Sequence, residues 1–187
     1  MYKLLWMLAA LFCVLAAPAW AADFKPAPLG TILLDLDTAE QHGSVWELDE
    51  LGTINAMRAT VTIRGLQPDT GRIKPGTMIT LSNAGEMVYF MVMCAPATSV
   101  CSMVMLHNRG DTDVKEDGGI FLSALGIGVG QPFTIAVDWT AQGEVSVTLS
   151  DKETHTAKMS APPTKLEIDG FASEVEFKPL SIGRTGQ

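Results

Sequence analysis

The stretch FMVMCAPATSVCSMVML, from Phe90 to Leu106, sets two cysteines, Cys94 and Cys101, between two apolar runs. Both runs are rich in residues that favour β-strands, and the APATSV segment between them is short enough for a hairpin loop. Residues that oppose each other in an antiparallel pair bring their Cβ atoms within reach of a disulfide. The stretch therefore predicts a β-hairpin closed by a Cys94–Cys101 disulfide. A redox pair is the alternative, but redox motifs usually have only two residues between the cysteines.

The start of the chain, MYKLLWMLAALFCVLAAPAWA, has the layout of a secretory signal peptide. A single lysine precedes the apolar run Leu4–Ala17, Pro18 disfavours further helix, and Ala19 and Ala21 form an A-x-A cleavage pattern. We expect cleavage after Ala21, which removes Cys13 and predicts a periplasmic or secreted protein with no membrane insertion after cleavage. An uncleaved membrane anchor is the alternative, because the apolar run is nearly long enough to span a bilayer.

The chain remaining after cleavage suits one domain. We divide the sequence into a signal peptide at 1–21, a leader segment at 22–29 and a β-sandwich domain at 30–187. Without the leader and its one lysine, 12 Lys and Arg face 21 Asp and Glu, a net charge of −9. We expect no nucleic-acid partner, because phosphate binding needs clustered basic residues. For the same reason we do not expect binding to an anionic membrane surface.

Apolar and polar residues alternate strictly in MRATVTIR (57–64), in GEVSVTLS (143–150) and in SEVEFK (173–178). This period of two is typical of strands with one buried face. Further predicted strands are Thr31–Asp37, Gly43–Glu50, Thr77–Ser82, Ile120–Ala124, Phe133–Thr140, Thr154–Met159 and Lys165–Ile168. No amphipathic helical segment follows the leader. About twelve short strands in one domain predict a two-sheet antiparallel β-sandwich of the jelly-roll type.

The stretch FTIAVDWTAQGEVSVTLSDKE, from Phe133 to Glu153, resembles the hairpin of concanavalin A-like lectin/glucanase jelly rolls. A strand ends in a tryptophan, a short glycine turn follows, and an alternating strand comes next. GIGVGQP before it and FASEVEFKPLSIG near the end lie where that fold places a loop and its final strand. The resemblance implies this fold for about residues 30–183. Its members include lectins, laminin-G-like modules, glycoside hydrolases and polysaccharide lyases, so it does not choose a function.

The segment WELDELG offers the best catalytic pattern, because Glu47 and Asp49 share one face of a predicted strand. Paired carboxylates are the acid and base of glycosidases. The pattern departs from the E-x-D-x-E motif of glucanases at Leu51, where the third carboxylate is missing. The three histidines are isolated and lie outside any catalytic motif. We expect a polar strand end here and assign no catalytic residue.

The loop NRGDTDVKEDGG gathers oxygen ligands within a few residues, chief among them Asp111, Asp113 and Asp117. Carboxylates in one loop are the ligands that calcium prefers. The spacing differs from that of an EF-hand, and a solvated turn is the alternative. Apart from this calcium ion, we expect no cofactor.

Four residues are candidates for ligand binding. Trp46 and Trp139 are the aromatic rings best suited to stacking on a sugar, with core packing as the alternative. Arg58 and Arg64 point outward on the Met57–Arg64 strand, and a guanidinium can bond two ligand oxygens at once. We expect Arg58 to be exposed. The alternative is an ordinary solvated sheet face, because any such face carries a row of outward polar side chains.

These observations predict an exported, non-catalytic binding module for a glycan or another extracytoplasmic ligand on a jelly-roll scaffold. One alternative is an envelope protein with a structural or protein-interaction role and no small ligand. A more distant alternative is a glycoside hydrolase or polysaccharide lyase.

Overall fold

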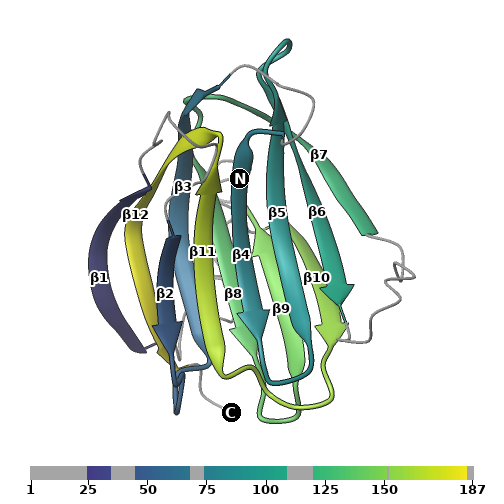
Figure 1. Cartoon of the computed structure of the whole chain (residues 1–187). Helices are drawn as coiled ribbons and strands as arrows, with labels where there is room; N and C mark the ends of the chain where they lie inside the picture. Colours follow the sequence, from purple (N-terminus) through teal and green to yellow (C-terminus); the bar gives the residue numbers. More distant parts are fainter. Residues whose placement is uncertain (1–24, 35–44, 68–73, 109–119, 151, 185–187) are drawn as a thin grey trace, which may run out of the picture.

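The computed structural model describes residues 25–34, 45–67, 74–108, 120–150 and 152–184. They form twelve strands in two antiparallel sheets of six that pack face to face (Figure 1). Sheet I has the order β1 (Lys25–Leu34), β12 (Ser173–Arg184), β3 (Ala56–Leu66), β8 (Phe133–Trp139), β9 (Glu144–Leu149), β10 (Glu153–Lys158). Sheet II has the order β2 (Val45–Asp49), β11 (Lys165–Phe171), β4 (Gly76–Ser82), β5 (Met87–Ala95), β6 (Val100–Asn108), β7 (Ile120–Gly128). The predicted two-sheet β-sandwich is confirmed.

The first strand begins earlier than the sequence pattern predicts. β1 starts at Lys25, inside the segment 22–29, and its pairing with β12 opposes Lys25 to Arg184. Pro26 and Pro28 hide this strand in the sequence, because proline cannot donate to a ladder. β1 lies at the edge of sheet I, where a missing donor on the open side is tolerated.

The predicted disulfide is confirmed. Cys94 on β5 opposes Cys101 on β6, their Cα atoms are 4.0 Å apart, and the bond between them closes the hairpin. Both cysteines are buried between the sheets. The predicted signal peptide lies outside the described residues. Within those residues, no helix is long and apolar enough to cross a membrane.

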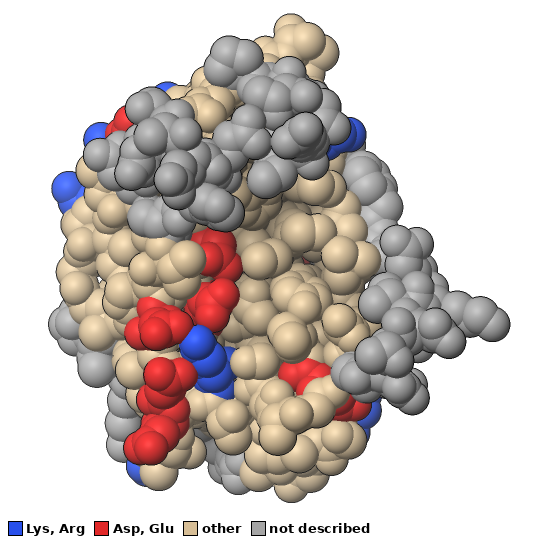
Figure 2. Space-filling model, viewed as in Figure 1, with Lys and Arg blue, Asp and Glu red and all other residues tan. Residues whose placement is uncertain are grey.

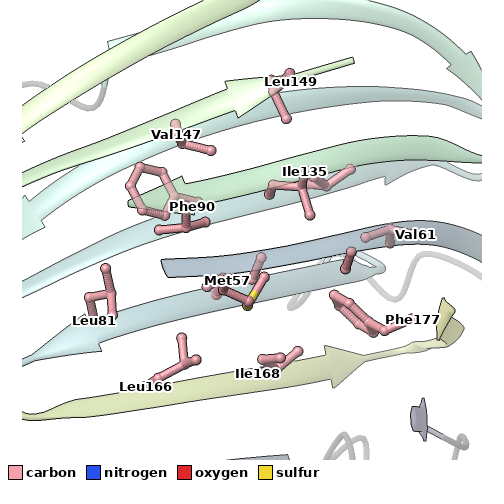
Figure 3. Close-up of a cluster of buried hydrophobic side chains, with 14 of the residues drawn as sticks. Met57, Val61, Leu81, Phe90, Ile135, Val147, Leu149, Leu166, Ile168 and Phe177 are labelled. Carbon is pink, nitrogen blue, oxygen red and sulfur yellow. The ribbon is translucent and has the colours of Figure 1, made fainter. Parts of the chain in front are cut away.

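The core lies between the two sheets and follows the period-two pattern of the sequence. In the part of β3 from Met57 to Ile63, every second side chain is buried, as the alternation predicts: Met57, Ala59, Val61 and Ile63. Figure 3 shows Met57 and Val61 beside Phe177 of β12, with Leu166 and Ile168 of β11 nearby. Since residues 166 and 168 point into the core, residues 165, 167 and 169 of β11 point outward.

Candidate functional site

The outer face of sheet II carries a group of charged side chains on two neighbouring strands. Glu47 and Asp49 of β2 lie beside Lys165, Glu167 and Asp169 of β11, and we call these five residues the acidic band. In the strand register Glu47 opposes Glu167, and Asp49 opposes Lys165. Figure 2 shows the band as red side chains around one blue side chain, next to an uncharged area. The prediction that Glu47 and Asp49 share a face is confirmed.

Lys165 forms salt bridges with three of the four carboxylates of the acidic band. Its Nζ lies 2.6 Å from Oε2 of Glu47, 3.2 Å from Oε2 of Glu167 and 3.8 Å from Oδ1 of Asp49. Like charges directly opposite each other destabilise a strand pair, so Lys165 offsets the repulsion between Glu47 and Glu167. The hydrogen bond to Glu47, followed by the one to Glu167, raises the pKa of Lys165 above its ordinary value. Lys165 therefore stays protonated at neutral pH.

Asp169 is the carboxylate of the band that forms no salt bridge within the described part of the chain. Its pKa is raised to about 6, first by burial and then by the negative charge of Glu167 and a hydrogen bond with it, while Lys165 lowers it. That hydrogen bond needs a proton on one of the two carboxyl groups. When both are ionised, neither is a donor, and Oδ2 of Asp169 is buried with no hydrogen-bond partner among the described residues.

Thr80 of β4 lies beside the acidic band and has a similar unmet hydrogen bond. In the register it stands between Glu167 of β11 and Tyr89 of β5, on the outward side of the sheet. The residue is only 6% exposed, and its Oγ1 has no partner among the described residues. A buried hydroxyl without a partner costs about 1–3 kcal/mol, so a ligand atom that pairs with Oγ1 of Thr80 would recover part of that cost.

Beyond Thr80 the outer face of sheet II becomes apolar. Met78, Tyr89, Met91, Val104 and Leu106 are half-buried side chains on β4, β5 and β6, and we call them the apolar flank. The Tyr89 hydroxyl donates to Sδ of Met87 at 3.0 Å. One face of the molecule thus sets ionised and hydroxyl groups directly beside an apolar surface.

A cavity of about 1070 Å³ opens at the end of the sandwich next to the acidic band. Its walls come from residues 49–55, 82–84, 139–141 and 162–165, with Arg184. Backbone hydrogen bonds fix the wall segments, from Leu51 N to Thr164 O at 3.1 Å and from Trp139 N to Asn55 O at 2.9 Å. The cavity is therefore preformed, and it shares Asp49 and Lys165 with the band.

The two arginines predicted for binding lie on the opposite face, on β3 of sheet I. The expectation that Arg58 is exposed is wrong, because its side chain is 13% exposed and pairs with Asp138 of β8 at 2.6 Å. It also donates to the backbone oxygens of Met57 and Val137. Arg64 is exposed and lies 2.6 Å from Oε1 of Glu176. The structure therefore separates both arginines from the acidic band.

The other predicted residues have different locations. Trp46 points inward from β2 and packs, partly buried, against the core. Trp139 is 4% exposed and lines the end cavity. The calcium candidates Asp111, Asp113 and Asp117 lie outside the described residues. Among residues that are described, no group of three or more His, Cys, Asp or Glu side chains is placed to hold a metal ion.

Sequence reasoning missed the contribution of β11 to this face. The alternation in KLEIDG at 165–170 signals a strand with Lys165, Glu167 and Asp169 on one side. It does not say which strand lies beside it. The partner strand β2 is more than 100 residues away, since the Lys165–Glu47 pair spans 118 positions.

Comparison with known proteins supports the fold. No model of a known protein family matches the sequence, and no curated protein does. An alginate lyase from Pseudomonas aeruginosa has 17% identity and a TM-score of 0.53, over 75% of this chain and 68% of the lyase. CG-16, a homodimeric agglutinin from chicken liver, has 11% identity and a TM-score of 0.51, over 75% and 100%. A carbohydrate esterase from Shiga toxin-encoding bacteriophage phi24B has 10% identity and a TM-score of 0.55, over 88% of both chains. The chain thus has the concanavalin A-like jelly-roll fold that its Phe133–Glu153 hairpin implies.

Proposed function

We propose that this protein is an exported, non-catalytic binding module that takes a glycan on the outer face of sheet II. The observation that carries the proposal is the row Glu47, Glu167, Thr80 and Tyr89, which crosses four neighbouring strands in register. Carboxylates accept hydrogen bonds from sugar hydroxyls, a threonine hydroxyl both donates and accepts, and an aromatic side chain packs against the apolar face of a sugar ring. Convergent polar groups beside an apolar surface are the usual composition of a ligand site.

The similar structures lend support of a general kind. Their names describe an agglutinin, an alginate lyase and a carbohydrate esterase. A shared fold does not choose among these activities, so the proposal depends on the residues of this face. The proposed export is supported by the signal-peptide pattern at residues 1–21. The Cys94–Cys101 disulfide also fits an oxidising compartment.

A glycoside hydrolase is the second candidate, and one observation favours it. Asp169 has a pKa raised to about 6 and lies two residues from Glu167 on the same face of β11. A carboxyl group that holds its proton up to about pH 6, next to a second carboxyl group, resembles the acid–base pair of glycosidases. Release of new reducing ends from a bound glycan would establish this candidate. A bound glycan that is recovered intact supports the binding module.

A glycan array probed with the mature protein, with and without calcium, tests the proposed function. Glu167→Gln and Tyr89→Ala are expected to weaken binding to each positive glycan by about tenfold or more, which corresponds to about 1.4 kcal/mol. Arg64→Ala, an exposed arginine on sheet I, is the matched control and is expected to leave binding unchanged. The calcium arm also tests the predicted ligands Asp111, Asp113 and Asp117.

Two results contradict this site. Loss of binding in Arg64→Ala with no loss in Glu167→Gln would move the site to the outer face of sheet I. No binding on the array, together with a melting temperature that calcium does not change, would favour the envelope interaction protein instead.

A further inference from the structure

The charges of the acidic band do not balance. Its four carboxylates, Glu47, Asp49, Glu167 and Asp169, face one ammonium group. Lys165 lies within 4 Å of the first three and forms no salt bridge with Asp169. At neutral pH the carboxylate of Asp169 is thus half-buried next to the like charge of Glu167, and its Oδ2 has no donor among the described residues. Lys165 acts on this charge only from beyond salt-bridge distance, so no close cation compensates it within the described residues.

Thr80 provides a second and independent observation on the same face. Thr80 is only 6% exposed, and its Oγ1 has no hydrogen-bond partner within the described residues. In the register Thr80 lies directly beside Glu167, and Cβ atoms of such neighbours are about 4.5–5.5 Å apart. Glu167 and Asp169 of β11 and Thr80 of β4 are thus neighbours on the outward side of sheet II, and Oδ2 of Asp169 and Oγ1 of Thr80 have no hydrogen-bond partner among the described residues.

We propose that the ligand of this face is a glycan with free amino groups, built from unacetylated hexosamine units. This inference rests on the proposed function and specifies its ligand. A protonated amine has three N–H donors, which matches the acceptors of Asp169, Glu167 and Thr80. The hydroxyl groups of the sugar have the remaining carboxylates as partners, and its ring lies against the apolar flank.

The charge of the face separates this ligand class from the others. An anionic glycan is repelled by a band with a net charge of −3 when its groups are ionised, counted from four carboxylates and Lys165. A neutral glycan supplies hydroxyl donors but leaves the charge of Asp169 uncompensated in a half-buried position. A protonated amine alone provides both charge and donors. Charge-assisted hydrogen bonds are roughly twice as strong as neutral ones, so the amine is expected to dominate recognition.

The binding is expected to depend on the ionisation of Asp169. The charged groups that face it are Glu167 and Lys165 on its own strand and Glu47 from β2, while β4 contributes the uncharged Met78 and Thr80. Protonation of Asp169 near pH 6 removes the charge that an ammonium group pairs with. The advantage of the natural protein over Asp169→Asn should therefore disappear as the pH falls through about 6.

Titration calorimetry with two β-1,4-linked hexosamine oligosaccharides of equal length tests this proposal. One oligosaccharide has free amines and the other is fully N-acetylated, so they differ only at the nitrogen, where the acetyl group removes the charge and N–H donors and adds a carbonyl and a methyl group. At low salt and a pH between about 6 and neutrality, where the Asp169 carboxylate and the sugar amines are both partly charged, the free-amine oligosaccharide is expected to bind at least about tenfold more tightly. Added salt should reduce that preference, and Asp169→Asn should abolish it. Glu144→Gln, an exposed carboxylate on sheet I, is the control that should keep it.

Each contrary result overturns a defined part of the reasoning. Equal binding of the two oligosaccharides, or tighter binding of the acetylated one, refutes the amine while the glycan site stands. Failure of both to bind also refutes the amine, and the array then decides whether the proposed function stands. Oligolysine that binds as tightly as the free-amine oligosaccharide refutes a glycan as the ligand and indicates a cationic peptide. An unchanged preference in a folded Asp169→Asn variant refutes the location.

Discussion

Replacement of Asp169 with asparagine is expected to stabilise the protein at neutral pH while weakening the proposed site. The folded-state pKa of Asp169 is about 6, above its ordinary value of 3.8. The folded protein thus binds this proton more tightly than the unfolded chain does. The stability that results is fully present below pH 3.8 and is lost as the pH rises through about 6. Asparagine cannot ionise, so it avoids that loss.

The size of the effect follows from the same values. The interval from 3.8 to about 6 corresponds to about 3 kcal/mol, since one pKa unit equals 1.36 kcal/mol. Asp169 is only half-buried, so screening by solvent reduces this to about 1–1.5 kcal/mol. The side-chain amide of asparagine can also donate a hydrogen bond to Glu167, so no proton has to be shared between two carboxyl groups.

Urea unfolding of the natural protein and of Asp169→Asn, at about pH 8 and about pH 4, measures this difference. The variant should be more stable by about 1 kcal/mol at the higher pH and nearly equal to the natural protein at the lower. Glu144→Gln, an exposed carboxylate on sheet I, should show little change at either pH. A variant that is destabilised at about pH 8, or equally stabilised at both values, would mean that the charge of Asp169 is already satisfied in the folded protein.

Further changes test the disulfide and the sheet I arginines. Reduction of Cys94–Cys101, which spans a sequence separation of 7, should cost about 2 kcal/mol, seen as a lower urea midpoint in the presence of a thiol. A midpoint that reductant leaves unchanged, with both thiols shown to be free, would contradict this. Arg58→Ala should cost about 2 kcal/mol in the same assay, because it leaves Asp138 without its partner at 2.6 Å. Arg64→Ala, on the exposed part of the same strand, should cost about 0.5 kcal/mol or less. Equal losses for the two arginines would refute the distinction.

The parts of the fold that could be predicted depend on residues that lie close together in the sequence. The alternation in Met57–Arg64 gives both the strand and its buried face, because side chains on a strand alternate between its two sides. The Cys94–Cys101 pair gives the register of β5 against β6, because the loop between them is short. Only the start of strand β1 escaped prediction, because Pro26 and Pro28 disguise a strand that an edge position permits.

The site was harder to predict because its residues meet only through distant pairings. Periodicity correctly put Glu47 and Asp49 on one face, but it gave no sign that Lys165 would lie 2.6 Å from Glu47. The same limit explains the error on Arg58. The sequence shows that it points out of sheet I, whereas its burial depends on Asp138, 80 residues further along on β8.

The order of strands in the two sheets has a consequence for how the chain folds. β1 pairs with β12 and β2 pairs with β11 in the described structure, so these two early strands find their partners in the last two. Closing such long loops is entropically costly, and folds with many distant contacts form slowly. Until residues 165–184 join the sheets, β3 and β4 present open edges that invite pairing with other chains. A newly made chain thus needs protection until β11 and β12 have emerged, and the pairing of β11 with β2 also brings Glu47 to Lys165.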